Sequence, residues 1–131
     1  MKCNPGPILI IDDDKDICDL LRLVLENEGY RVIVAADGLN AWQQLHAGLR
    51  PALMILDWMM PRMDGEEFLK NVSCTPALSK VPIIVMSGND AVQNGHTERN
   101  PGRYMRKPVE LDELLQVVAQ LLADSPKQEA A

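Results

Sequence analysis

Asp57 stands at the end of an apolar stretch, where ALMIL (52–56) runs directly into this aspartate and WMMPRMDG follows it. A carboxylate that leaves water without a compensating partner costs roughly several kcal/mol. An acid at this position must therefore meet a cation, a hydrogen-bond donor or a chemical task. Other parts of the chain have to supply that partner.

Further polar residues come directly after short apolar runs: Asp12, Asp13, Ser87 and Lys107. Clustered carboxylates repel one another, and a hard divalent cation relieves this because Mg2+ prefers oxygen ligands. Together these residue types suit phosphoryl transfer. Asp57 would be the nucleophile, while Mg2+, Lys107 and the Ser87 hydroxyl would share the charge on the equatorial oxygens.

The elements that must position these residues follow from the spacing of apolar side chains. Short, mostly continuous apolar runs predict strands buried on both faces at 8–11, 31–36, 52–56, 82–86 and, more weakly, 103–106. Apolar residues at helical spacing predict helices from Ile17 to a stop at Gly29, from Trp42 to Leu49 with Asn40 as a possible cap, from about Glu66 through Val72, and over 110–123. This alternation predicts an α/β fold, a doubly wound, five-stranded parallel sheet with helices on both faces.

All the candidate residues then fall at the carboxyl ends of strands, the edge at which ligands bind in open α/β sheets. One segment fits less well, because 87–102 should hold the fourth helix yet is polar, contains Gly95 and ends in Asn-Pro-Gly. We expect that helix to be weak or distorted. We expect one domain over 7–123, preceded by an N-terminal extension (1–6) and followed by a flexible tail (124–131).

Composition restricts the function further. The chain has 131 residues, of which 47% are hydrophobic, and a formal net charge of −6 with no basic stripe. Binding to nucleic acid or to a membrane surface is therefore not expected, and no apolar run is long enough for a membrane span. Three cysteines without C-x-x-C pairing indicate reduced thiols, and the chain is interpreted as cytoplasmic.

Four fragments in register, ILIIDDDKD, LMILDWMMPRMDG, IIVMSG and YMRKPV, resemble the receiver domain of two-component response regulators, of the single-domain chemotaxis type. The resemblance covers roughly residues 7 to 123. It implies a flavodoxin-like strand order, 2-1-3-4-5, and a signalling role rather than an enzyme's. Asp57 would accept a phosphoryl group from a sensor histidine kinase or a histidine phosphotransfer protein.

The same resemblance implies a metal site. Asp12 and Asp13 would be the acidic pair that binds Mg2+, with Asp13, Asp57 and the backbone carbonyl of Met59 as direct ligands. Asp14 and Asp16 have a plainer interpretation, as caps or favourable charges at the positive end of a helix dipole.

Other residues would respond to the phosphoryl group. Ser87 would hydrogen-bond it, Lys107 would pair with it, and Tyr104 falls at the aromatic switch position of the family. Tyr104 also has a plainer interpretation as ordinary packing. The Lys107–Pro108 peptide bond is expected to be cis, as in relatives.

Three other interpretations remain open. A haloacid-dehalogenase-type phosphohydrolase also uses a strand-end aspartate, a Ser or Thr and a lysine, but it needs a further acidic pair after a later strand. A pseudo-receiver would keep the fold as a binding module without phosphorylation. A phosphorelay intermediate would pass the phosphoryl group onward.

Overall fold

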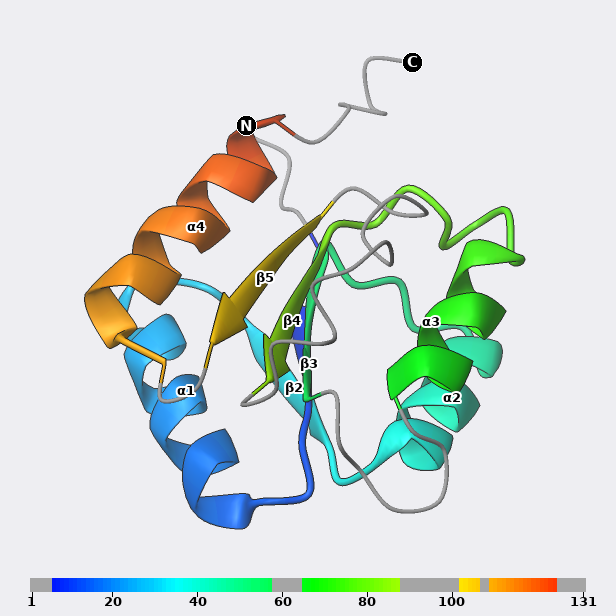
Figure 1. The fold of residues 1–131 in the computed structure, drawn as a ribbon, viewed down its shortest axis with the longest axis horizontal. Coiled ribbons are helices and arrows are strands. Elements are labelled where there is room, and N and C mark those ends of the chain that lie inside the picture. The colour runs from blue at the N-terminus through cyan, green and yellow to red at the C-terminus, as the bar shows by residue number, and fades with distance from the viewer. Residues whose placement is uncertain (1–5, 58–64, 88–101, 107–108, 125–131) are drawn as a thin grey trace.

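The computed structural model describes residues 6–57, 65–87, 102–106 and 109–124. Strands and helices alternate along most of the chain (Figure 1), in the order β1 (Ile8–Ile11), α1 (Lys15–Asn27), β2 (Val32–Ala35), α2 (Gly38–His46), β3 (Leu53–Asp57), α3 (Gly65–Ser73), β4 (Ile83–Ser87), β5 (Gly102–Arg106) and α4 (Leu111–Asp124). The predicted strands and helices are therefore present. Their ends differ from the predicted ones by a few residues at most, the start of α2 being the largest difference.

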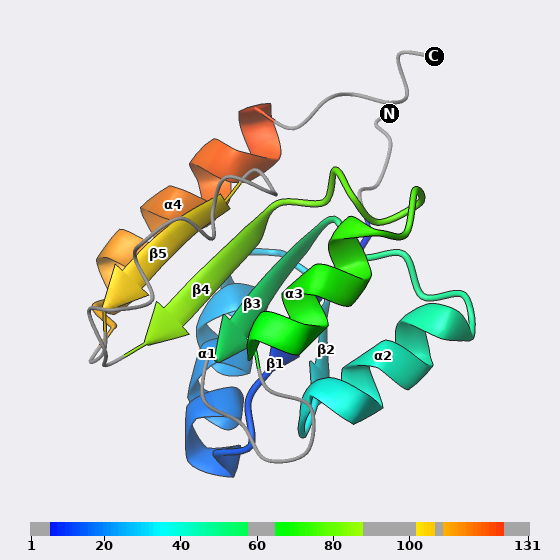
Figure 2. The same cartoon turned by 45° about the vertical axis from the view of Figure 1, so that its right-hand side comes forward.

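The strands form one parallel sheet in the order β2-β1-β3-β4-β5. Helices α1 and α4 cover one face of this sheet, and α2 and α3 cover the other (Figures 1 and 2). The doubly wound fold and the strand order implied by the family resemblance are confirmed. The fourth helix expected within 87–102 falls almost wholly in 88–101, outside the described residues.

The strands are continuously apolar because successive side chains enter two different cores. In β1, Ile8 and Ile10 pack in the cluster that includes Leu25 of α1, while Leu9 and Ile11 pack in the cluster that includes Phe68 of α3. β3 and β4 divide their side chains between the same two clusters. Both faces of the sheet are therefore packed against helices, and this packing positions the carboxyl ends of the strands.

Helix α1 begins at a side-chain cap. The Asp14 carboxylate accepts hydrogen bonds from the backbone N–H groups of Asp16 (3.0 Å) and Ile17 (3.4 Å), and Asp16 adds an acid to the first turn. The capping role expected for Asp14 is confirmed. The chain turns out of the helix at Gly29, whose φ of +95° is a conformation that favours glycine.

Helix α2 begins earlier than predicted, and the prediction of Asn40 as its cap is wrong. Asp37 is the cap, with an extended backbone (φ −160°, ψ 177°) and a carboxylate that accepts the backbone N–H of Asn40 at 2.8 Å. Asn40 lies inside the helix and its side chain accepts a hydrogen bond from Gln44.

Among the helices that the structure describes, none is long and apolar enough to cross a membrane.

Candidate functional site

The register of the sheet brings two buried acids together at its carboxyl edge. Ile11 of β1 pairs with Leu56 of β3, so Asp12, the residue after β1, lies beside Asp57, the last residue of the neighbouring strand. Asp13 follows directly, and one carboxylate oxygen from each of Asp12, Asp13 and Asp57 lies within 4.8 Å of the others. Asp57 thus forms one cluster with Asp12, which is 45 positions earlier in the sequence, and with Asp13. The strand-end argument predicts this convergence.

The three aspartates of the cluster differ in their exposure to solvent. Asp12 is 1% exposed and Asp57 is 5% exposed, whereas Asp13 is exposed. This donor set is all oxygen and fits Mg2+. Neighbouring ligands of an octahedral ion at about 2.1 Å lie about 3 Å apart, so the carboxylates would move closer together when an ion binds.

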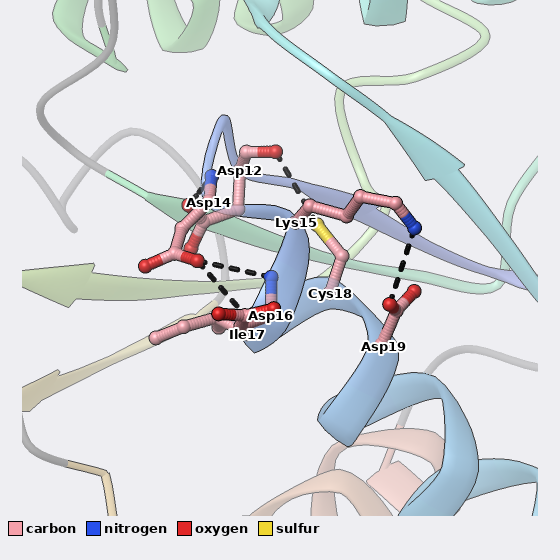
Figure 3. A network of polar contacts seen from close by, with 7 residues as sticks. All are labelled: Asp12, Asp14, Lys15, Asp16, Ile17, Cys18 and Asp19. Carbon is pink, nitrogen blue, oxygen red and sulfur yellow. Dashed lines mark hydrogen bonds and ion pairs between the residues drawn. The ribbon is translucent and has the colours of Figure 1, made fainter.

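Backbone contacts hold Asp12 in place from both sides. Its N–H donates to the carbonyl of Ala35 in β2 at 3.2 Å, and its carboxylate accepts the N–H of Asp14 at 2.9 Å. Its own carbonyl accepts a hydrogen bond from the thiol of Cys18, with a sulfur–oxygen distance of 3.3 Å (Figure 3). The loop between β1 and α1 is therefore tied to β2, to its own backbone and to the first turns of α1.

Cys18 is a contributor that the sequence reasoning missed. Burial and, after it, the negative charge of Asp12 raise the pKa of the Cys18 thiol from 9.0 to about 11, so the thiol keeps its proton at neutral pH and can donate it. Its helical spacing with Leu21 and Leu25 could have indicated that Cys18 lies on the buried face of α1. Of the described cysteines, Cys18 and Cys74 are free, in agreement with the expected reduced thiols.

Ser87 reaches the same edge from the next strand. Asp57 pairs with Met86 of β4, and Ser87 is the residue that follows, with Arg106 of β5 as its own partner. The backbone of Ser87 is therefore near Asp57, at the edge where the strand-end argument placed it. Lys107, the residue after Arg106, lies outside the described residues.

Tyr104 lies in the middle of β5, opposite Val85, and packs half-buried against the cluster that includes Phe68. Its packing role is thus present, and its switch role stays a prediction. Met59 and Pro108 lie outside the described residues, so the carbonyl ligand and the cis peptide bond also stay predictions.

Comparison with known proteins agrees with this geometry. The sequence profile described as "Response regulator receiver domain" matches residues 8–119. Response regulator MprA from Mycobacterium bovis is 36% identical over 126 residues, which are 95% of this chain and 54% of that protein. The chain thus spans about half the length of the curated relatives that it matches.

Solved structures give the same result. A response regulator from Chloroflexus aurantiacus is 34% identical, with a TM-score of 0.83 over 92% of this chain and 99% of that one. The chemotaxis response regulator CheY4 of Vibrio cholerae is 25% identical, with a TM-score of 0.81 over 90% of this chain and 99% of that one.

The chain belongs to the response regulator receiver domain family, the phosphorylation-dependent signalling domains of two-component systems. Receiver domains are in general signalling modules rather than enzymes with a free substrate.

Proposed function

We propose that this chain accepts a phosphoryl group on Asp57 in an Mg2+-dependent reaction and changes its affinity for a protein partner as a result. The observation that carries the proposal is the convergence of Asp12, Asp13 and Asp57 within 4.8 Å in a receiver fold. The donor would be a phosphohistidine on a sensor histidine kinase or a histidine phosphotransfer protein.

Each acid has a separate task in this reaction. An Asp57 oxygen attacks phosphorus in line, so the new oxygen–phosphorus bond forms as the bond between phosphorus and the donor's imidazole nitrogen breaks. Asp12 and Asp13 would be the acidic pair that holds the metal ion, with Asp13, Asp57 and the carbonyl of Met59 as its direct protein ligands. When bound, Mg2+ supplies positive charge that neutralises the phosphoryl oxygens.

Further residues would convert the modification into a signal. Lys107 and the Ser87 hydroxyl bind the oxygens of the phosphoryl group, and Tyr104 follows that movement as a packing switch. An aspartyl phosphate is a mixed anhydride that hydrolyses unaided, so the signal is transient. A cytoplasmic location fits the free thiols of Cys18 and Cys74.

Incubation with a small-molecule phosphodonor and Mg2+, followed by intact mass measurement, tests the proposal. Wild type should gain one phosphoryl group with Mg2+ and none in EDTA, and Asp57→Asn should gain none, because an amide is neither a nucleophile nor a good magnesium ligand. Asp19→Asn, an exposed acid on α1 that is paired with Lys15, is the matched control and should label like wild type. Equal labelling of Asp57→Asn and wild type would refute the proposal.

The phosphohydrolase alternative has no observation in its favour among the described residues. Its additional acidic pair would have to come from Glu110, Asp112 or Glu113, and these are exposed at the beginning of α4. We expect no turnover of a general phosphatase substrate with Mg2+. Multiple turnover that Asp12→Asn abolishes would favour the hydrolase.

A further inference from the structure

We infer that Cys18 is a positioning residue for the acidic cluster, because its thiol fixes the peptide unit that joins the two aspartates expected to bind Mg2+. This inference rests on the proposed function of the site. The Cys18 thiol donates to the backbone carbonyl of Asp12, and not to a carboxylate of the cluster, so it would act through Asp12 and Asp13.

The contact joins the core face of α1 to the loop before it. Cys18 lies in the second turn of α1 and is 4% exposed, packed in the same cluster as Ile10 of β1 and Leu21. Packing holds its sulfur in place. From there the thiol donates to the backbone carbonyl of Asp12, which is six residues earlier and has already left β1 (Figure 3).

This hydrogen bond matters because its acceptor is the backbone carbonyl next to Asp13. The carbonyl oxygen of Asp12 belongs to the planar peptide unit between Asp12 and Asp13. Holding that oxygen fixes the plane, and with it the directions in which both side chains leave the backbone. The N–H of Asp12 is held by Ala35 and its carboxylate accepts the N–H of Asp14, and the thiol adds a constraint on the carbonyl, on the side that links Asp12 to Asp13.

Groups that orient metal ligands affect affinity without touching the ion. Loss of such a group typically weakens metal binding about tenfold to a hundredfold, and a thiol is a weaker donor than the usual imidazole or carboxylate partners. We therefore expect Cys18→Val, which keeps an apolar side chain of similar size but has no donor, to weaken Mg2+ binding about threefold to tenfold. Cys18→Ser keeps a donor and should bind Mg2+ close to wild type.

Calorimetric titration of MgCl2 into the metal-free full chain tests this, with Leu25→Val as the matched control. Leu25 is fully buried on the same face of α1, about two turns further along the helix than Cys18, so its truncation lowers stability without removing the thiol contact. The expected result is weaker Mg2+ binding in Cys18→Val, and wild-type binding in both Leu25→Val and Cys18→Ser. Cys18→Ala replaces Cys18→Val if the larger side chain prevents folding.

Infrared spectroscopy gives a second readout that packing alone would not move. The S–H stretching band that is lost in Cys18→Ser should shift when MgCl2 is added to wild type, because the Asp12 peptide responds to the charge beside it. Unchanged Mg2+ affinity in both Cys18→Val and Cys18→Ala, or equal weakening in Leu25→Val, would overturn the inference while leaving the proposed function intact. A wild type that binds no Mg2+ at all would overturn both.

Discussion

At the residue scale, Asp57 shows how a strand can end in a buried charge. The residue is 5% exposed, and a carboxylate oxygen of Asp57 lies within 4.8 Å of one from Asp12 and one from Asp13. Three negative charges at this separation repel one another, and desolvation strengthens that repulsion. We therefore expect a cation to stabilise the cluster.

Cys18 gives a pH prediction at the same scale. The folded chain holds the thiol proton more tightly than the unfolded chain, since burial raises the pKa from 9.0 to about 11. The thiol's contribution to the free energy of unfolding is thus fully present below about pH 9 and falls as the pH rises toward about 11. Urea denaturation across this window in EDTA should show a steeper loss for wild type than for Cys18→Ser, which has no thiol. Parallel losses in the two proteins would contradict the assignment.

At the element scale, sequence periodicity predicted strands better than helix starts. A strand buried on both faces is a continuous apolar run, and β1 came out as predicted over Ile8–Ile11. The start of α2 did not, because Asp37 and Asn40 are both good capping residues. The choice between them depends on the extended backbone of Asp37, which no pattern of residue types reveals. The Cys18 contact was missed for the same reason, since it depends on the path of the loop.

Removal of the α1 cap tests the element directly. Asp14→Ala should lower the free energy of unfolding by about 1 kcal/mol, because two N–H groups at the start of α1 lose their acceptor. Asp19→Ala on the same helix is the control. It removes an exposed ion pair with Lys15 and should cost about 0.5 kcal/mol or less. Urea denaturation of both variants measures this, and equal losses would mean that Asp14 has no special role as a cap.

At the scale of the whole molecule, the fold fixes the site through the order of its strands. With β1 next to β3, the residues after them meet, and helices on both faces hold the sheet in place. The chain's alternating pattern predicted the carboxyl edge at which these residues gather, whereas the strand order that sets Asp12 beside Asp57 was implied by the family resemblance. Ser87 was placed at the edge by its backbone, whereas the roles of Lys107 and Met59 depend on loop positions outside the described residues.

Metal binding should therefore change the stability of the whole domain. Mg2+ at ten times its Kd should stabilise wild type by about 1.4 kcal/mol, because the cluster exists only in the native state. Thermal melts should show a Tm higher by several degrees, and Asp13→Ala should lose this shift. In EDTA, Asp13→Ala should melt at or above the wild-type Tm, since one repulsive charge is gone. A much lower Tm for that variant in EDTA would show that the cluster is not repulsive.

Chemical mapping of the phosphorylated residue tests the central claim most directly. Borohydride reduces an aspartyl phosphate to homoserine, so tandem mass spectrometry of the reduced, digested protein identifies the acceptor after incubation with a phosphodonor and Mg2+. The account predicts homoserine at position 57 and unmodified aspartate at positions 12 and 13. Homoserine at position 12 or 13, or a phosphoryl group that borohydride does not remove, would contradict the assignment of Asp57 as the acceptor.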